Sequence, residues 1–396
     1  MADQIVEWDF DHNTDEALLD HMWRRWDELR EQSRFIKTTN VGPDDVWVMT
    51  YFDDVHEALR DYELFSNVSV TINEEVGAHR FIPEELDPPE HGKYRQILTP
   101  WFAPAAVDAM EGRVRSLCVE LIERFAADGR CDVATDFARV FPTTIFMEIM
   151  GLPVERSEQL VQWAETMMHT PAEEDPDGAV RMQAAMEVMG MLGQLAAERR
   201  AEPRDDLISA LIAAEIDGEP MGEQELLQMS ILLYMAGLDT VAGELSAFFH
   251  HLATHPEDRR RIVDEPAAIP NAVEELLRAY SIVSPGRVVT RDVEWNGCPM
   301  KAGDRVLLPT GVANRDPLAF PNATAVDIDR VQNRHVAFGA GPHRCVGSNL
   351  ARMELVVAME EWHARIPDYR IDATEPLRFH SGGVAGFTRL PLVWET

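Results

Sequence analysis

Cysteine is scarce in this chain of 396 residues, which contains four. The four lie far apart and show neither a close pair nor the regular spacing of a disulfide framework; they are Cys118, Cys131, Cys298 and Cys345. Secreted disulfide scaffolds are short and dense in cysteine. The scarcity therefore argues against disulfides and predicts a protein of the reducing cytoplasm.

The sequence also lacks marks of export, of a membrane span and of nucleic-acid binding. Residues 1–16 have no basic stretch followed by an apolar run, so we expect no signal peptide. The apolar run 226–238 is short for a span and is followed by Asp239 and Glu244, which are costly in lipid, so we interpret it as a buried helix. Basic residues number 36 against 69 acidic ones, and the net charge of −33 opposes binding to nucleic acid or anionic membranes.

Internal repeats, low-complexity tracts and long Gly/Ser linkers are absent from the sequence as well. Length alone would allow two or three domains, and a hydrophobic content of 45% is ample for a large core. Because nothing in the composition separates modules, we predict one domain spanning residues 1–396. A Gly-rich dinucleotide fingerprint and a flavin module are not evident either.

Most of the chain shows the periodicity of helices. In residues 104–129 apolar side chains recur every three or four positions until Gly129 ends the pattern. The same pattern predicts helices at 157–168, 180–200, 206–215, 223–253, 268–280 and 348–365. Alternation and turn signals predict fewer strands, clustered toward the two ends of the chain, at 46–51, at 287–295 and, after the turn Asn296-Gly297, at 305–309. The fold class is therefore mainly α.

Cys345 lies in a segment whose composition suits a metal-bound thiolate. Such a thiolate needs backbone N–H groups directed at the sulfur and a chain that turns tightly around it. Gly339, Gly341 and Gly347 supply that freedom, and a helix starting near residue 348 adds its positive N-terminus.

A thiolate in such a loop could bind the iron of haem, and two other roles for Cys345 compete with this one. Structural zinc needs four nitrogen or sulfur ligands, whereas His343 is the only such neighbour in the sequence. An inert buried cysteine would not need this surrounding of glycines and charge. The residues favour ligation of haem iron by the cysteine sulfur.

The segment Phe338-Gly339-x-Gly341-x-His343-Arg344-Cys345-x-Gly347 resembles the haem-binding signature of the cytochrome P450 family. The resemblance covers nearly the whole chain and is strongest to soluble bacterial members such as the camphor hydroxylase. It implies haem b (iron protoporphyrin IX) bound through Cys345, and a thiolate ligand of this kind promotes O–O cleavage. It also implies a single triangular fold, with a long central helix over the haem and small β-sheets at one side.

Asp239 and Thr240 place an acid and an alcohol in an otherwise apolar helix, which is costly unless the pair has a use. Alone, the pair would be unremarkable, because threonine can bond back to its own helix. The resemblance implies that Thr240 hydrogen-bonds bound dioxygen, that Asp239 relays protons, and that Gly237 leaves room beside the iron.

The resemblance assigns further residues to the haem environment. Glu275, Arg278 and Arg330 match three partners that brace the wall behind the haem, although an acid and a base three apart are by themselves usually a weak surface pair. Four residues match positions that bind the haem propionates, which need charged or hydrogen-bonding partners; they are His91, Arg95, Arg287 and His343. Phe338, Gly339 and Gly347 are implied to surround the cofactor in the cysteine loop.

The substrate pocket follows from the resemblance alone, and each of its residues could equally serve packing. Carried over position by position, the substrate neighbours are His79, Leu232, Val283, Gly383 and Val384. The related camphor hydroxylase has a tyrosine where His79 stands. Imidazole can donate, accept or carry charge, so this departure leaves open which polar group of a substrate it would meet.

The expected activity is a monooxygenase that inserts one atom of dioxygen into a C–H bond of a small, mostly apolar, terpenoid-like substrate. Its electrons would come from a separate ferredoxin and reductase, docking on cations around the cysteine, namely Lys93, Arg95, Arg344 and Arg352. Propionates or pairing at helix ends could use those charges instead. A haem-thiolate peroxygenase and a non-catalytic haem sensor or carrier are the alternatives, and Asp239 with Thr240 argues against both.

Overall fold

The computed structural model describes residues 5–8, 12, 15–38, 46–72, 80–170, 174, 175 and 177–396. The α-helices in these ranges are α1 Glu16–Gln32, α2 Phe52–Ala58, α3 Glu90–Leu98, α4 Pro104–Glu123, α5 Val140–Met150, α6 Ser157–His169, α7 Ala179–Ala201, α8 Leu207–Ile212, α9 Glu223–Thr254, α10 Pro256–Asp264, α11 Ile269–Ala279, α12 Thr310–Ala313 and α13 Ser348–Arg365. The strands are β1 Val6–Glu7, β2 Phe35–Thr38, β3 Val46–Met49, β4 Phe65–Ser66, β5 Arg130–Asp132, β6 Glu215–Ile216, β7 Glu219–Pro220, β8 Gly286–Val289, β9 Val293–Trp295, β10 Cys298–Met300, β11 Arg305–Leu307, β12 Arg370–Ile371, β13 Arg378–His380, β14 Gly386–Arg389 and β15 Pro391–Val393. The expected mainly α fold, with small sheets beside the helices, is confirmed.

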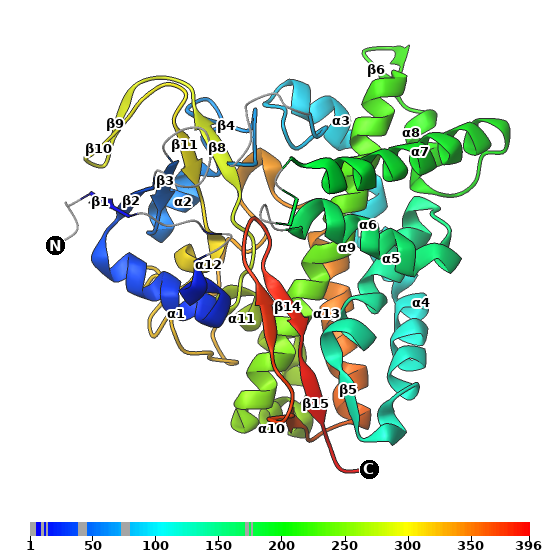
Figure 1. The fold of residues 1–396 in the computed structure, drawn as a ribbon, viewed down its shortest axis with the longest axis vertical. Helices are drawn as coiled ribbons and strands as arrows, with labels where there is room; N and C mark the ends of the chain where they lie inside the picture. Colours follow the sequence, from blue (N-terminus) through cyan, green and yellow to red (C-terminus); the bar gives the residue numbers. More distant parts are fainter. Residues whose placement is uncertain are drawn as a thin grey trace.

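The long helix α9 runs through the middle of the molecule (Figure 1). It packs against α5, α7, α10 and α13, and α13 in turn packs against α4. By length and composition α9 could also cross a membrane, with a mean hydropathy of 1.4 in its most apolar window. Its place among the other helices shows why it is apolar, because a helix in a protein interior has the same composition.

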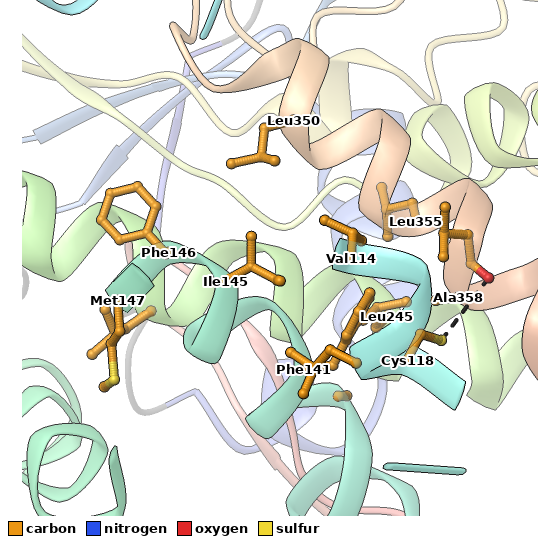
Figure 2. Packing of buried hydrophobic residues seen from close by; sticks show 14 of the residues in the cluster. Val114, Cys118, Phe141, Ile145, Phe146, Met147, Leu245, Leu350, Leu355 and Ala358 are labelled. Atoms are coloured by element: carbon orange, nitrogen blue, oxygen red, sulfur yellow. Dashed lines mark hydrogen bonds between the residues drawn. The ribbon is translucent and has the colours of Figure 1, made fainter. Parts of the chain in front are cut away.

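The main hydrophobic core lies where α4, α5, α9 and α13 meet (Figure 2). Val114, Phe141, Leu245 and Leu355 come from these four helices, and their side chains are fully buried. Burying a side chain of this size contributes about 1.5–3 kcal/mol. The core therefore holds α9 and α13 firmly beside each other, and these two helices carry much of the site described below.

The largest sheet joins distant parts of the chain in the order β1-β2-β3-β11-β8-β4. Strand β11 pairs in parallel with β3 and antiparallel with β8. Figure 1 shows these strands together at the side of the molecule away from α4 and α5. The sheet fixes β8, and with it Arg287, next to the helical core.

Two predicted elements were wrong in their extent. The strand expected at 287–295 breaks after Val289; β9 then turns through Asn296 and Gly297, both at positive φ, and pairs with β10, whereas β11 pairs with β8. The helix expected at 206–215 ends at Ile212, because the chain turns at Asp217 and Gly218 to form the hairpin of β6 and β7. With β5, this hairpin also places strands in the middle of the chain, not only toward its ends.

Candidate active site

A cavity of about 430 Å³ lies between α9 and the loop that precedes α13. Most of its wall is apolar, and its larger side chains come from α3, α5, α9, α11, α13 and the segments between helices; they include Leu98, Phe102, Phe146, Leu232, Leu233, Leu277, Val283 and Leu350. A concave, mostly apolar space with a few convergent polar groups is the usual form of a small-molecule site. The polar groups in this wall are therefore the candidates for chemistry.

The cysteine loop forms one wall of the cavity, and the Cys345 side chain opens into it. The backbone N–H of Cys345 donates to the carbonyl of Phe338 at 2.8 Å, which closes the loop. Gly341 adopts φ +71°, and a Cβ at this position would lie 2.9 Å from the carbonyl oxygen of Leu59. Only glycine fits this turn, as the sequence predicted. Phe338, Gly339 and Gly347 also line the cavity.

Some surroundings of the Cys345 sulfur favour the neutral thiol, and others favour the charged thiolate. Burial raises the pKa of the thiol, while a backbone hydrogen bond from Gly347 and the positive charge of Arg95 oppose that rise. Helix α13 begins at Ser348, so its N-terminal dipole is also near the sulfur. A metal ion at the sulfur would settle the balance in favour of the thiolate.

A cluster of four basic side chains lies at the edge of the cavity, as the sequence predicted. The rings of His91 and His343 are 4.1 Å apart between centroids, and Arg95 and Arg287 line the cavity. Burial, and then the neighbouring His91 and Arg287, lower the pKa of His343 to about 2. Burial likewise lowers the pKa of Arg287 to about 10. These lowered pKa values show that positive charge on the cluster is unfavourable unless an anion joins it.

Unpaired polar atoms show that this cluster suits a carboxylate ligand. Both ring nitrogens of His343 and the Nε of Arg287 are buried without a hydrogen-bond partner in the described part of the chain. Buried donors rarely remain unpaired in a finished site. The two propionates of haem would supply the missing acceptors and charge, and the cysteine sulfur lies in the same cavity. The residues present therefore fit haem.

Asp239, Thr240 and Gly237 line the cavity from α9, as predicted. The Thr240 hydroxyl donates to the carbonyl of Ala236 at 3.1 Å, the back-bonded arrangement common in helices. A Cβ on Gly237 would lie 2.2 Å from the nearest ring atom of Phe146. The room beside this glycine is thus taken by the Phe146 ring, which itself lines the cavity.

Asp239 also lines a second, smaller cleft on α9, together with Arg139, Glu165 and His380. Arg139 and Glu165 form an ion pair of 2.6 Å there. Asp239 therefore lies between two hollows of different character, one mostly apolar and one with several ionisable groups.

The three residues expected to brace the wall behind the haem are in contact. Arg278 donates to the Glu275 carboxylate at 2.6 and 2.8 Å, and Arg330 donates to it at 2.9 Å. The side chains of Glu275 and Arg278 are fully buried. Arg278 also donates to the carbonyls of Asn314 and Ala323, so the cluster ties α11 to the segment that leads toward the cysteine loop.

The expected substrate neighbours do not all share the cavity. Leu232, Val283 and Val384 line it. Gly383 is not among the lining residues, and its carbonyl accepts from the backbone N–H of Ser284 at 2.9 Å. His79 lies outside the described residues.

Three acids of the cavity wall were missed by the sequence reasoning as site residues; they are Glu84, Glu244 and Glu354. Burial raises the pKa of Glu244 and of Glu354 well above the ordinary value, and each has one carboxyl oxygen without a partner in the described structure. The sequence could have predicted Glu244 as a site residue, because it lies one helical turn after Thr240 and so on the same face of the helix. Glu84 and Glu354 could not have been predicted, because only the folded chain brings them to the cavity.

Comparison with known proteins agrees with this geometry. The chain matches the family model of cytochrome P450 over residues 16–272 and 267–362. It is 39% identical over 351 residues to probable cytochrome P450 127A1 of Sinorhizobium fredii, covering 88% of this chain and 83% of that protein. It is 34% identical over 379 residues to the mycinamicin IV hydroxylase/epoxidase of Micromonospora griseorubida, covering 93% of this chain and 95% of that protein.

Solved structures show the same relationship. The structure of CYP101J2 superposes with a TM-score of 0.88 at 34% identity, and that of cytochrome P450 CYP101C1 with 0.89 at 31%. Both comparisons cover 100% of this chain and 98% of the other. The chain therefore belongs to the cytochrome P450 family, and it is a haem-dependent monooxygenase.

Proposed function

We propose that the protein inserts one atom of dioxygen into a C–H bond of a small, mostly apolar, terpenoid-like substrate, with the second oxygen atom leaving as water. One observation carries the proposal: Cys345, Asp239 and Thr240 all line a single cavity whose wall is otherwise largely apolar. Leu232, Val283 and Val384 would contact the substrate there. His79 and Gly383 stay predictions as substrate neighbours.

The cofactor of the proposed reaction is haem b, held in one domain that spans residues 1–396. Cys345 would bind the iron, and His91, Arg95, Arg287 and His343 would hold the propionates. Bound haem supplies the redox chemistry of oxygen activation. Glu275, with its two arginine partners, would brace the wall behind it.

Asp239 and Thr240 would deliver protons to dioxygen. Thr240 can turn its hydroxyl from the Ala236 carbonyl toward the cavity, because both lie on the same face of α9. Asp239, which lines both the cavity and the cleft of Arg139 and Glu165, can take up a proton on one side and release it on the other. The apolar wall would keep bulk water from the reaction.

Electrons would come from a ferredoxin with a separate reductase, in the cytoplasm. The proposed docking surface comprises Lys93, Arg95, Arg344 and Arg352. Lys93 pairs with Asp217, and Arg352 pairs with Glu274, so two of these four charges are partly neutralised. Arg344 is exposed and donates to the Ser348 hydroxyl at 3.2 Å, which leaves it the most accessible cation of the four.

The proposal is tested with the haem-loaded protein, a ferredoxin, its reductase and NADH. We expect the reduced protein with carbon monoxide to give a thiolate-type spectrum, and terpenoid ligands to convert the resting haem to its high-spin form. Product formation should follow NADH consumption. Cys345→Ala should abolish the thiolate spectrum.

Other results would contradict the proposal in different ways. A histidine-type carbon monoxide spectrum, or native spectra in Cys345→Ala, would refute thiolate ligation. Turnover with peroxide but not with the electron donors would identify a peroxygenase. Normal spectra without any oxidised product from a broad ligand screen would point to a sensor or carrier.

A further inference from the structure

Glu84 is an acid of the cavity wall whose carboxyl group forms no hydrogen bond or ion pair in the described part of the chain. Its neighbour Glu85 is buried and accepts hydrogen bonds from the backbone N–H groups of Val70 and Phe81, at 3.1 and 2.9 Å. Asp87 accepts from the backbone of Asn67 at 3.0 Å. These two acids fix the loop, whereas Glu84 lines the cavity and makes neither a hydrogen bond nor an ion pair within the described structure.

The two cations whose charge acts on Glu84 are also the ones expected to bind the haem propionates. Glu84 lies in the electrostatic field of Arg287 and Arg95, but neither guanidinium comes within 4.0 Å of its carboxylate to form an ion pair. The same two arginines belong to the cluster that fits the haem propionates. Two bound propionates would take these cations and add two negative charges nearby. Burial raises the pKa of Glu84 and disfavours its carboxylate form, so a positive or donating group from elsewhere would stabilise that form.

Apolar residues of the loop that carries Glu84 and of the segments beside it line the same cavity. Phe81, Val70 and Pro285 line the cavity with it, and Val283 connects this region to the proposed substrate contacts. Asp239 adds further acid to the cavity on the side of α9, whereas the lining cations among the described residues belong to the propionate cluster. The substrate side of the cavity therefore favours a positive charge joined to an apolar body.

We propose that Glu84 binds a cationic head group of the substrate, so that the substrate is an amine-derived molecule with a compact apolar skeleton. The inference rests on the proposed function, because it assigns a chemical class to the substrate of that same cavity. Glu84 would hold the head group near the propionate edge, and the apolar skeleton would extend along α9 toward Thr240. Position 84 would then select the substrate and orient it, without taking part in the reaction itself.

Three ligands that share one apolar cage and differ in charge test the inference with the haem-loaded protein. They are 1-adamantyltrimethylammonium, 1-adamantanol and 1-adamantanecarboxylate, and their dissociation constants are read from the high-spin shift and by calorimetry. The trimethylammonium group has no lone pair and cannot ligate iron. We expect the wild type to bind the cation about tenfold or more tightly than the carboxylate, and Glu84→Gln to weaken cation binding by about tenfold while changing alcohol binding less than about threefold.

Two further variants separate a local contact from a general charge effect. Glu84→Lys should reverse the preference and favour the carboxylate. Glu90→Gln removes one negative charge from an exposed residue in the first turn of α3, next to the same loop, and should leave all three affinities within about twofold. A structural role for Glu84 would instead lower haem content without changing the order of the three ligands.

The preference of the wild type needs no variant, so the inference is tested even if Glu84→Gln folds poorly. Equal or tighter binding of the carboxylate, binding of none of the three ligands, or an unchanged preference in Glu84→Gln would overturn it. In those cases a thiolate-type spectrum and product formation from neutral substrates would leave the proposed function intact. Loss of the thiolate spectrum in the wild type would refute the proposed function itself.

Discussion

The guanidinium of Arg352 lies over the ring of Phe338, with its Cζ 4.4 Å from the ring centroid. The same guanidinium pairs with Glu274, which also contacts His335 at 3.1 Å. Burial opposes ionisation of Glu274, but the hydrogen bonds from His335 and Arg352 outweigh it and hold its pKa at about 2. Arg352 thus joins α13 to the cysteine loop, and changing it alters the loop as well as the surface charge.

For this reason Arg344 is the better probe of partner docking. Arg344→Glu should slow reduction by ferredoxin by about tenfold at low salt, and the effect should shrink as ionic strength rises. Stopped-flow reduction under carbon monoxide measures this rate, and the thiolate spectrum should be unchanged. Arg352→Glu should slow reduction too, with an altered haem spectrum. If neither reversal changes the rate, the docking surface lies elsewhere.

Glu275→Gln tests the fully buried cluster behind the proposed haem position. The variant would leave Arg278 buried with its charge uncompensated, and the loss of one partner from such a pair costs about 3–5 kcal/mol. Denaturant unfolding should show this loss, and haem content should fall with it. Glu120→Gln, which breaks an exposed ion pair with Arg124, should cost less than about 1 kcal/mol. Equal losses in both variants would contradict a bracing role.

Glu244 gives the stability a specific pH dependence. Burial raises its pKa in the folded protein well above the ordinary 4.5, so the folded state binds this proton more tightly than the unfolded chain. Its contribution is therefore complete below pH 4.5 and is lost as pH rises toward the folded pKa. Relative to wild type, Glu244→Gln should gain up to about 1.4 kcal/mol per pH unit across that window.

Unfolding by denaturant at a series of pH values from 5 to 9 measures the difference between Glu244→Gln and wild type. Glu294→Gln, an exposed position on β9, serves as the control and should give a difference that does not change with pH. A constant difference for Glu244→Gln as well would show that its carboxyl is ionised throughout.

Substitutions of Asp239 and Thr240 should differ in their effects on the rate of product formation and on the share of NADH electrons lost to hydrogen peroxide. Asp239→Asn should lower the rate of product formation by about 100-fold, because it removes the group that passes protons on. Thr240→Ala should keep NADH consumption but divert electrons to hydrogen peroxide, and Thr240→Ser should restore coupling. Peroxide and product are measured per NADH consumed. Full coupling in Thr240→Ala would contradict the proposed role of the hydroxyl.

Gly237→Ala should move the Phe146 ring, since the new Cβ would overlap it. Overpacking of this kind costs about 1–3 kcal/mol, and we expect weaker ligand binding in the high-spin assay. Phe146→Leu in the same chain should recover much of the lost stability, because it removes the ring. If the double variant is no more stable than Gly237→Ala, the ring is not the source of the strain.

The sequence predicted correctly those features that depend on residues close together along the chain. The loop around Cys345, the start of α13 at Ser348 and the acid-alcohol pair on α9 each depend on a few consecutive residues, and all were predictable. Glu84 and Phe146 were not, because their roles depend on contacts with distant segments. The break after Val289 and the pairing of β9 with β10 were missed for a related reason: an apolar alternating run does not reveal where it breaks or which strand it meets.

The pairing of β3 with β11 has a consequence for how the protein is made. Residues 46–48 meet residues 305–307 in this sheet, so most of the chain must emerge from the ribosome before β3 gains that neighbour. Contacts between such distant residues form slowly, and β3 keeps one open edge until they do. Arg287, held by the same sheet, joins the other cations only at that stage. The cofactor pocket is therefore completed late in synthesis, and stable uptake of haem has to wait for it.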